Sequence, residues 1–102
     1  MCGIVGFSGN GDRASLEAAL EALRHRGPDD SGIYEDNSHN IGLAHSRLSI
    51  QDLSDLGHQP MVSEDNKFVI IFNGEIYNFK ELRDELVQEG INFRGNSDTE
   101  VL

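Results

Sequence analysis

The longest apolar run in this chain, Phe68 to Phe72, is only five residues long. A helix that crosses a bilayer needs about 20 apolar residues, so this sequence offers no membrane-spanning segment. A short apolar run without polar alternation predicts a strand that is covered on both faces. The chain therefore has to build a small domain from short strands and short helices.

Turn and cap signals divide the rest of the sequence into such elements. Four apolar residues between Leu16 and Leu23 recur at helical spacing and predict an amphipathic helix over 14–24, which Gly27-Pro28 ends. Asn78 to Glu81 has the spacing of a capping box that opens a second helix, closed by Gly90. The expected strands are 4–7, 33–34, 41–45, 68–72 and 91–93, with a polar turn at 37–40 and a loop at 52–59. We therefore expect an α+β fold class.

The last residues carry another capping signature, Ser97 to Glu100, followed only by Val101 and Leu102. A helix of one turn is unstable by itself. We therefore expect residues 1–102 to be the N-terminal part of a longer protein, with a broad apolar face left exposed.

The net charge and the cysteine content limit which partners and which cellular compartment are expected. The formal net charge is −10 and the isoelectric point is about 4.6, which excludes attraction to nucleic acid or to an anionic membrane surface. The single cysteine cannot form an internal disulfide, and no signal peptide is recognisable. We expect a cytoplasmic protein.

That single cysteine, Cys2, directly follows Met1. If Met1 is removed, Cys2 carries a thiol and a free α-amine on one carbon. An α-amine has a pKa of about 7.7–8.0, so part of it is unprotonated at neutral pH and can accept the thiol proton. One residue then supplies both nucleophile and general base. The alternative is that a cysteine at this position has no function.

Three further sites carry chemistry-bearing residues. Arg47 ends an apolar strand, where a guanidinium can bind a carboxylate with two parallel hydrogen bonds or simply lie at the sheet edge. Asn73-Gly74 follows the longest apolar run, and it is either a turn or an amide and a backbone N–H aimed at an oxyanion. Asp98 either receives a substrate ammonium or stabilises a helix N-terminus. Histidines 25, 39, 45 and 58 lack metal-ligand spacing, so no metal site is expected.

Six ordered motifs resemble the class II glutamine amidotransferase domain of glutamine-hydrolysing asparagine synthetases. They cover nearly the whole chain: 1–6 (MCGIVG), 24–29 (RHRGPD), 46–54 (SRLSIQDLS), 57–61 (GHQPM), 72–83 (FNGEIYNFKELR) and 97–100 (SDTE). The resemblance implies an N-terminal-nucleophile hydrolase fold, a four-layer α-β-β-α sandwich of which only the N-terminal part is present.

The resemblance also implies roles for individual residues. Cys2 would attack the side-chain amide of glutamine and form a thioester. Asn73 and the backbone N–H of Gly74 would stabilise the oxyanion. The remaining implied residues bind glutamine: Arg47 its α-carboxylate, Asp98 and Glu75 its α-ammonium, and Leu48 and Ile50 through backbone contacts.

The implied partners are glutamine and a synthetase domain that receives the ammonia. That domain would bind ATP and magnesium, whereas no cofactor is expected in residues 1–102. Aspartate is the expected amide acceptor, with another carboxylate or a sugar acid as the alternative. A non-catalytic glutamine-binding or truncated module is the competing function, and a homodimer is a further expectation.

Overall fold

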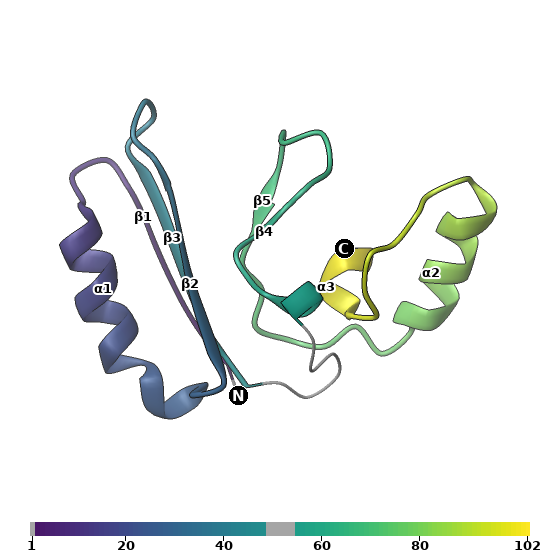
Figure 1. The fold of residues 1–102 in the computed structure, drawn as a ribbon, viewed down its shortest axis with the longest axis horizontal. Helices are drawn as coiled ribbons and strands as arrows, with labels where there is room; N and C mark the ends of the chain where they lie inside the picture. Colours follow the sequence, from purple (N-terminus) through teal and green to yellow (C-terminus); the bar gives the residue numbers. More distant parts are fainter. Residues whose placement is uncertain (1, 49–54) are drawn as a thin grey trace.

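The computed structural model describes residues 2–48 and 55–102. Its helices and strands confirm an α+β fold, and Figure 1 shows α1 on one side of a three-stranded sheet, with a two-stranded sheet, α3 and α2 following on the other side. The elements are β1 (Gly3–Ser8), α1 (Arg13–Ala22), η1 (Arg24–Arg26), β2 (Asp30–Asp36), β3 (Ile41–Arg47), η2 (Asp55–Gly57), β4 (Met61–Val62), β5 (Val69–Ile70), α2 (Phe79–Gln88) and α3 (Asp98–Val101).

The three-stranded sheet is antiparallel with the order β1-β3-β2. Gly3 pairs with Ser46, so Cys2 lies at the end of β1 beside the last residues of the central strand. Side chains alternate between the two faces of a strand. Ser46 faces α1, where its hydroxyl donates to the Gly27 carbonyl at 2.6 Å, and Arg47 therefore belongs to the opposite face.

The first helix begins where the sequence predicts. Asp12 is its N-cap, and its carboxylate accepts a 2.8 Å hydrogen bond from the Ser15 N–H. Leu16 is 1% exposed and packs the helix onto the sheet. After α1 the chain continues as the 3₁₀ turn η1, and Gly27 then lies directly against the backbone of Ser46 and Arg47.

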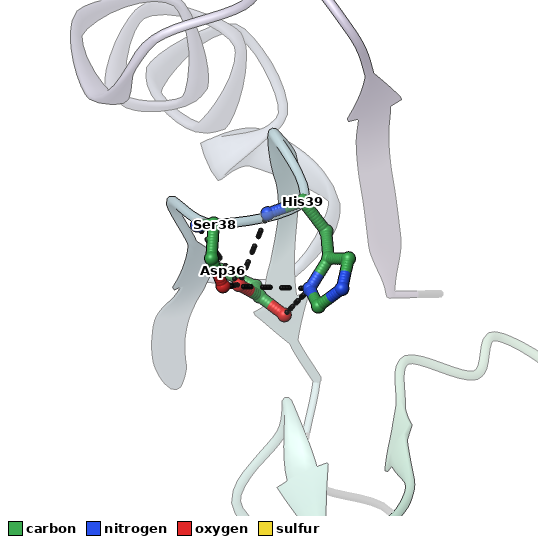
Figure 2. Close-up of polar contacts among 3 residues, drawn as sticks. All are labelled: Asp36, Ser38 and His39. Carbon is green, nitrogen blue, oxygen red and sulfur yellow. Dashed lines mark hydrogen bonds and ion pairs between the residues drawn. The ribbon is translucent and has the colours of Figure 1, made fainter.

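The polar turn expected at 37–40 joins β2 to β3 (Figure 2). One Asp36 carboxylate oxygen accepts from the Ser38 hydroxyl at 2.7 Å, and the other lies 2.8 Å from His39 Nδ1. These hydrogen bonds lower the pKa of Asp36. The bond from the Ser38 hydroxyl has the larger effect and the bond with His39 the next largest. Asn40 adopts a positive φ of 53°, which asparagine tolerates better than most residues.

The second half departs from prediction at several places. The expected strand over 68–72 is wrong in length and cover: β5 has two residues, pairs only with β4, and leaves Phe68 72% exposed. Asn78 is the N-cap of α2, but its side chain makes no capping hydrogen bond. The expected strand over 91–93 is also wrong, because the Ile91 N–H bonds to the Leu86 carbonyl and closes α2.

Across residues 2–48 and 55–102, no helix combines the length and the apolar character that crossing a membrane requires. Exposed apolar side chains occur in both halves of this part of the chain. They include Ile4 at 45% and Val87 at 53%.

Candidate active site

A cavity of about 420 Å³ lies where the ends of β1 and β3 meet the segments 72–77 and 97–99. Cys2, Arg47, Asn73 and Asp98 all line it. These four residues come from separate parts of the sequence, and the structure brings them together around one space. Glu75, Gly74 and Leu48 line the same cavity, whereas Ile50 lies outside the described residues.

Cys2 is held at the end of β1 by Leu48, which directly follows β3, and by Arg26 of η1. Its sulfur accepts a hydrogen bond from the Leu48 N–H at 3.3 Å and lies 3.7 Å from the Leu48 carbonyl oxygen. Its own carbonyl accepts from Arg26 Nε at 3.3 Å. The backbone N–H of Leu48 therefore faces the sulfur.

Asn73 contacts the same residue from the other half of the chain. Its side-chain Nδ2 donates a 2.8 Å hydrogen bond to the Cys2 carbonyl. An amide NH₂ has two hydrogens, so this bond orients the group and leaves a second donor. Gly74 follows, exposed at the cavity, and a Cβ there would lie 2.9 Å from the Phe72 ring.

Gln59 anchors the segment that carries Asn73. Its buried side chain accepts from the Phe72 N–H at 2.6 Å and donates to the Thr99 hydroxyl at 3.2 Å. Asp98 makes a parallel link, because its Oδ2 accepts from the Ile76 N–H at 2.9 Å. The start of α3 and the 72–76 segment are therefore fixed to each other.

The cavity presents charges of both signs. Arg47, at the end of β3, is 8% exposed, and Asp98, at the start of α3, is 6% exposed. Glu75 is exposed and lies nearer to solvent. One buried cation and one buried anion beside a thiol and an amide suit a zwitterionic amino acid with a reactive side chain.

Two contributors to this geometry have no role assigned by sequence reasoning. Arg26 lies in the 24–29 motif and Gln59 in the 57–61 motif, but neither is predicted to hold Cys2 or Asn73. The only sequence signal that could have indicated them is that they lie in polar motifs to which no other role was assigned. Their partners are 24 and 13 residues away along the chain, so only the fold reveals them.

A family model described as the glutamine amidotransferase domain matches residues 1–102, the whole chain. The chain belongs to the glutamine amidotransferase domain family. Curated relatives agree with this assignment. An asparagine synthetase [glutamine-hydrolyzing] of Bacillus subtilis is 43% identical over 109 residues, covering 100% of this chain and 17% of the relative.

Two other relatives of this amidotransferase domain extend the comparison. An asparagine synthetase [glutamine-hydrolyzing] of Arabidopsis thaliana is 46% identical over 107 residues, covering all of the chain and 18% of the relative. A Gibberella zeae protein named amidase chry2 is 38% identical over 116 residues, again covering all of the chain and 17% of the relative. The chain spans only 17–18% of the length of these three curated relatives.

Proposed function

We propose that this domain hydrolyses the side-chain amide of glutamine and supplies the ammonia for asparagine synthesis in a longer protein. The observation that carries the proposal is the meeting of Cys2 and Asn73 in the cavity that Arg47 and Asp98 also line. A thiol nucleophile, an amide donor and a clamp for an amino acid occupy one space. The family assignment supports the same reaction.

In the first step, the Cys2 thiol attacks the amide carbon of glutamine. Removal of Met1, which lies outside the described residues, would free the α-amine to take the thiol proton. A carbon–sulfur bond forms as the carbonyl π electrons move onto oxygen. The second N–H of Asn73 and the backbone N–H of Gly74 receive that oxyanion.

In the second step, the tetrahedral intermediate collapses and the carbon–nitrogen bond breaks. The protonated α-amine returns its proton to the leaving nitrogen, so ammonia departs and a glutamyl thioester remains. Water then attacks the thioester with the amine as base. The products are glutamate and the free Cys2 thiol.

Substrate binding rests on the charged residues of the cavity. Arg47 holds the α-carboxylate of glutamine with two parallel hydrogen bonds. Asp98 and Glu75 receive the α-ammonium, and Leu48 and Ile50 contribute backbone contacts. The position of Arg47 and Asp98 supports this assignment, because a cation and an anion line the same cavity as Cys2 and Asn73.

The ammonia would pass to a synthetase domain that activates aspartate with ATP and magnesium. This proposal assigns ATP and magnesium to the synthetase domain. Within residues 2–48 and 55–102, no three His, Cys, Asp or Glu side chains are grouped so that they could hold a metal ion. The steps above involve neither group. The finer fold assignment, an N-terminal-nucleophile hydrolase sandwich, the cytoplasmic location and a homodimer belong to the same proposal.

Covalent labelling tests the proposed reaction in the full-length protein. A glutamine analogue with an electrophilic carbon in place of the amide should modify Cys2 alone, as located by peptide mass spectrometry. Glutamine should protect against the labelling, and asparagine, one methylene shorter, should protect far less. Labelling elsewhere, or equal protection by both amino acids, would contradict the proposal.

A further inference from the structure

His45 is a buried residue that lines the active-site cavity. It lies on β3 two residues before Arg47, so both side chains belong to the sheet face opposite α1. Its exposed fraction is 1%, and it lines the cavity with Cys2 and Asn73. Within residues 2–48 and 55–102, neither ring nitrogen has a hydrogen-bond partner, although both are fully buried. A buried polar group without a partner costs free energy, so its position calls for a physical reason.

The backbone of Phe72 lies against the ring. It favours the protonated form of His45, as an acceptor carbonyl does, but it does not form a hydrogen bond of normal geometry with either nitrogen. Hydrogen bonds in an active site are often long before substrate binds and tighten in the complex. Phe72 directly precedes Asn73, so a contact at this carbonyl acts on the proposed oxyanion donors.

The charge state of the ring suits this position. Burial, the largest cause, lowers the pKa of His45, and the neighbouring Arg47 lowers it further. Asp30 opposes the shift and His58 adds to it. The ring is therefore neutral at physiological pH. A neutral imidazole carries one N–H, so the ring can donate one hydrogen bond without placing a second cation beside Arg47.

The surroundings also fix where the ring can go. Gly32 of β2 pairs with His45, and the backbone of Gln59 lies against the bare α-carbon of Gly32. Gln59 in turn holds the Phe72 N–H at 2.6 Å. The N–H of Phe72 is thus anchored by Gln59, and the backbone of Phe72 also lies against the His45 ring.

We propose that His45 is a positioning residue of this site, whose ring N–H bonds to the Phe72 carbonyl in the substrate complex and fixes Asn73 and Gly74 at the oxyanion. The inference rests on the proposed glutaminase function. It adds a residue that touches neither substrate nor thiol, and that acts on the transition state through the Phe72–Gly74 backbone. It predicts an effect on kcat rather than on KM.

The test is steady-state glutamine hydrolysis by the full-length protein and its His45→Phe variant. We expect kcat to fall at least tenfold while KM stays within twofold. Alkylation of Cys2 by iodoacetamide, which needs the thiol but no oxyanion site, should keep its rate. His39→Phe alters an exposed histidine of the β2–β3 turn and should match the wild type. His45→Asn and His45→Gln each place an amide donor near one ring nitrogen, and one of them should recover most of kcat.

Three outcomes would overturn the inference. A folded His45→Phe variant with unchanged kcat removes the role, and a raised KM with unchanged kcat would instead place His45 in glutamine binding. A parallel fall in alkylation rate would mean that the whole site is distorted. If His45→Phe does not fold, the inference still requires His45→Asn and His45→Gln to differ in kcat by more than twofold. A wild-type protein that does not hydrolyse glutamine would instead contradict the proposed function.

Discussion

The side-chain amide of Asn73 donates a 2.8 Å hydrogen bond to the backbone carbonyl of Cys2, 71 residues earlier in the chain. The bond joins the two halves of the domain at the proposed reaction centre. It also orients the Asn73 amide, because one of its two hydrogens is held by the Cys2 carbonyl and the other is left as a further donor. This one hydrogen bond therefore places the Asn73 amide beside Cys2 and also sets its orientation.

Replacing Asn73 with alanine should lower kcat for glutamine hydrolysis by about 10²–10³. An oxyanion donor acts on charge that develops during the reaction, so KM should change much less. Steady-state kinetics of the full-length variant measures both constants, with circular dichroism as a check of folding. A folded Asn73→Ala variant with normal kcat would mean that Asn73-Gly74 is only a turn.

Replacing Arg47 with lysine should raise KM for glutamine by more than tenfold, a difference of about 1.4 kcal/mol in binding. Lysine keeps the positive charge but loses the two parallel hydrogen bonds of the guanidinium. Arg13→Lys is a matched control, because Arg13 is exposed and pairs with Glu17 and Glu35 away from the cavity. A KM within twofold for Arg47→Lys would show that Arg47 is not the carboxylate clamp.

Gly27→Ala should destabilise the fold by about 1–3 kcal/mol, the usual cost of overpacking. A Cβ at Gly27 would lie 2.5 Å from the Ser46 carbonyl oxygen, and backbone of the central strand cannot easily move away. At Gly6 the nearest atom belongs to the flexible Leu43 side chain at 3.1 Å, so Gly6→Ala should cost less. Urea unfolding of both variants makes the comparison, and an equal loss in the two would contradict this account of Gly27.

The pH dependence of stability should carry the signature of His45. Burial lowers its pKa in the folded state below the ordinary value of 6.5, so the unfolded chain binds the proton more readily. The free energy of unfolding is therefore unaffected by this group above pH 6.5, and it decreases as pH falls from there through the lowered folded-state pKa. Urea unfolding at pH 8 and at pH 5.5 should therefore show a larger loss for the wild type than for His45→Gln. Equal losses would contradict a buried neutral ring.

Local sequence signals predicted the first half of the fold well. The helical spacing from Leu16 to Leu23 and the polar turn at 37–40 concern contacts between near neighbours, and the structure confirms both. The strands expected at 68–72 and 91–93 failed for a different reason. A strand needs a partner, and at these places pairing is short or the backbone closes a helix instead.

The sequence predicted those residues of the site whose side-chain type indicates a chemical role. Cys2, Arg47, Asn73 and Asp98 could be selected as a nucleophile, a clamp, a donor and an acceptor, and the fold brings them to one cavity. Their supports could not be selected in that way. The side chains of Arg26 and Gln59 bond to backbone groups of Cys2 and Phe72. Every residue type has such backbone groups, so no sequence pattern predicts these partners.

Glutamine hydrolysis by the full-length Cys2→Ala variant tests the central claim most directly. Glutamate release is measured beside the wild type, with circular dichroism to show that the fold is kept and intact mass to show whether Met1 has been removed. The account predicts no glutamate above background, with amidation from free ammonia retained, because only the thiol step is lost. Glutamate formation by Cys2→Ala at a rate near that of the wild type would contradict it.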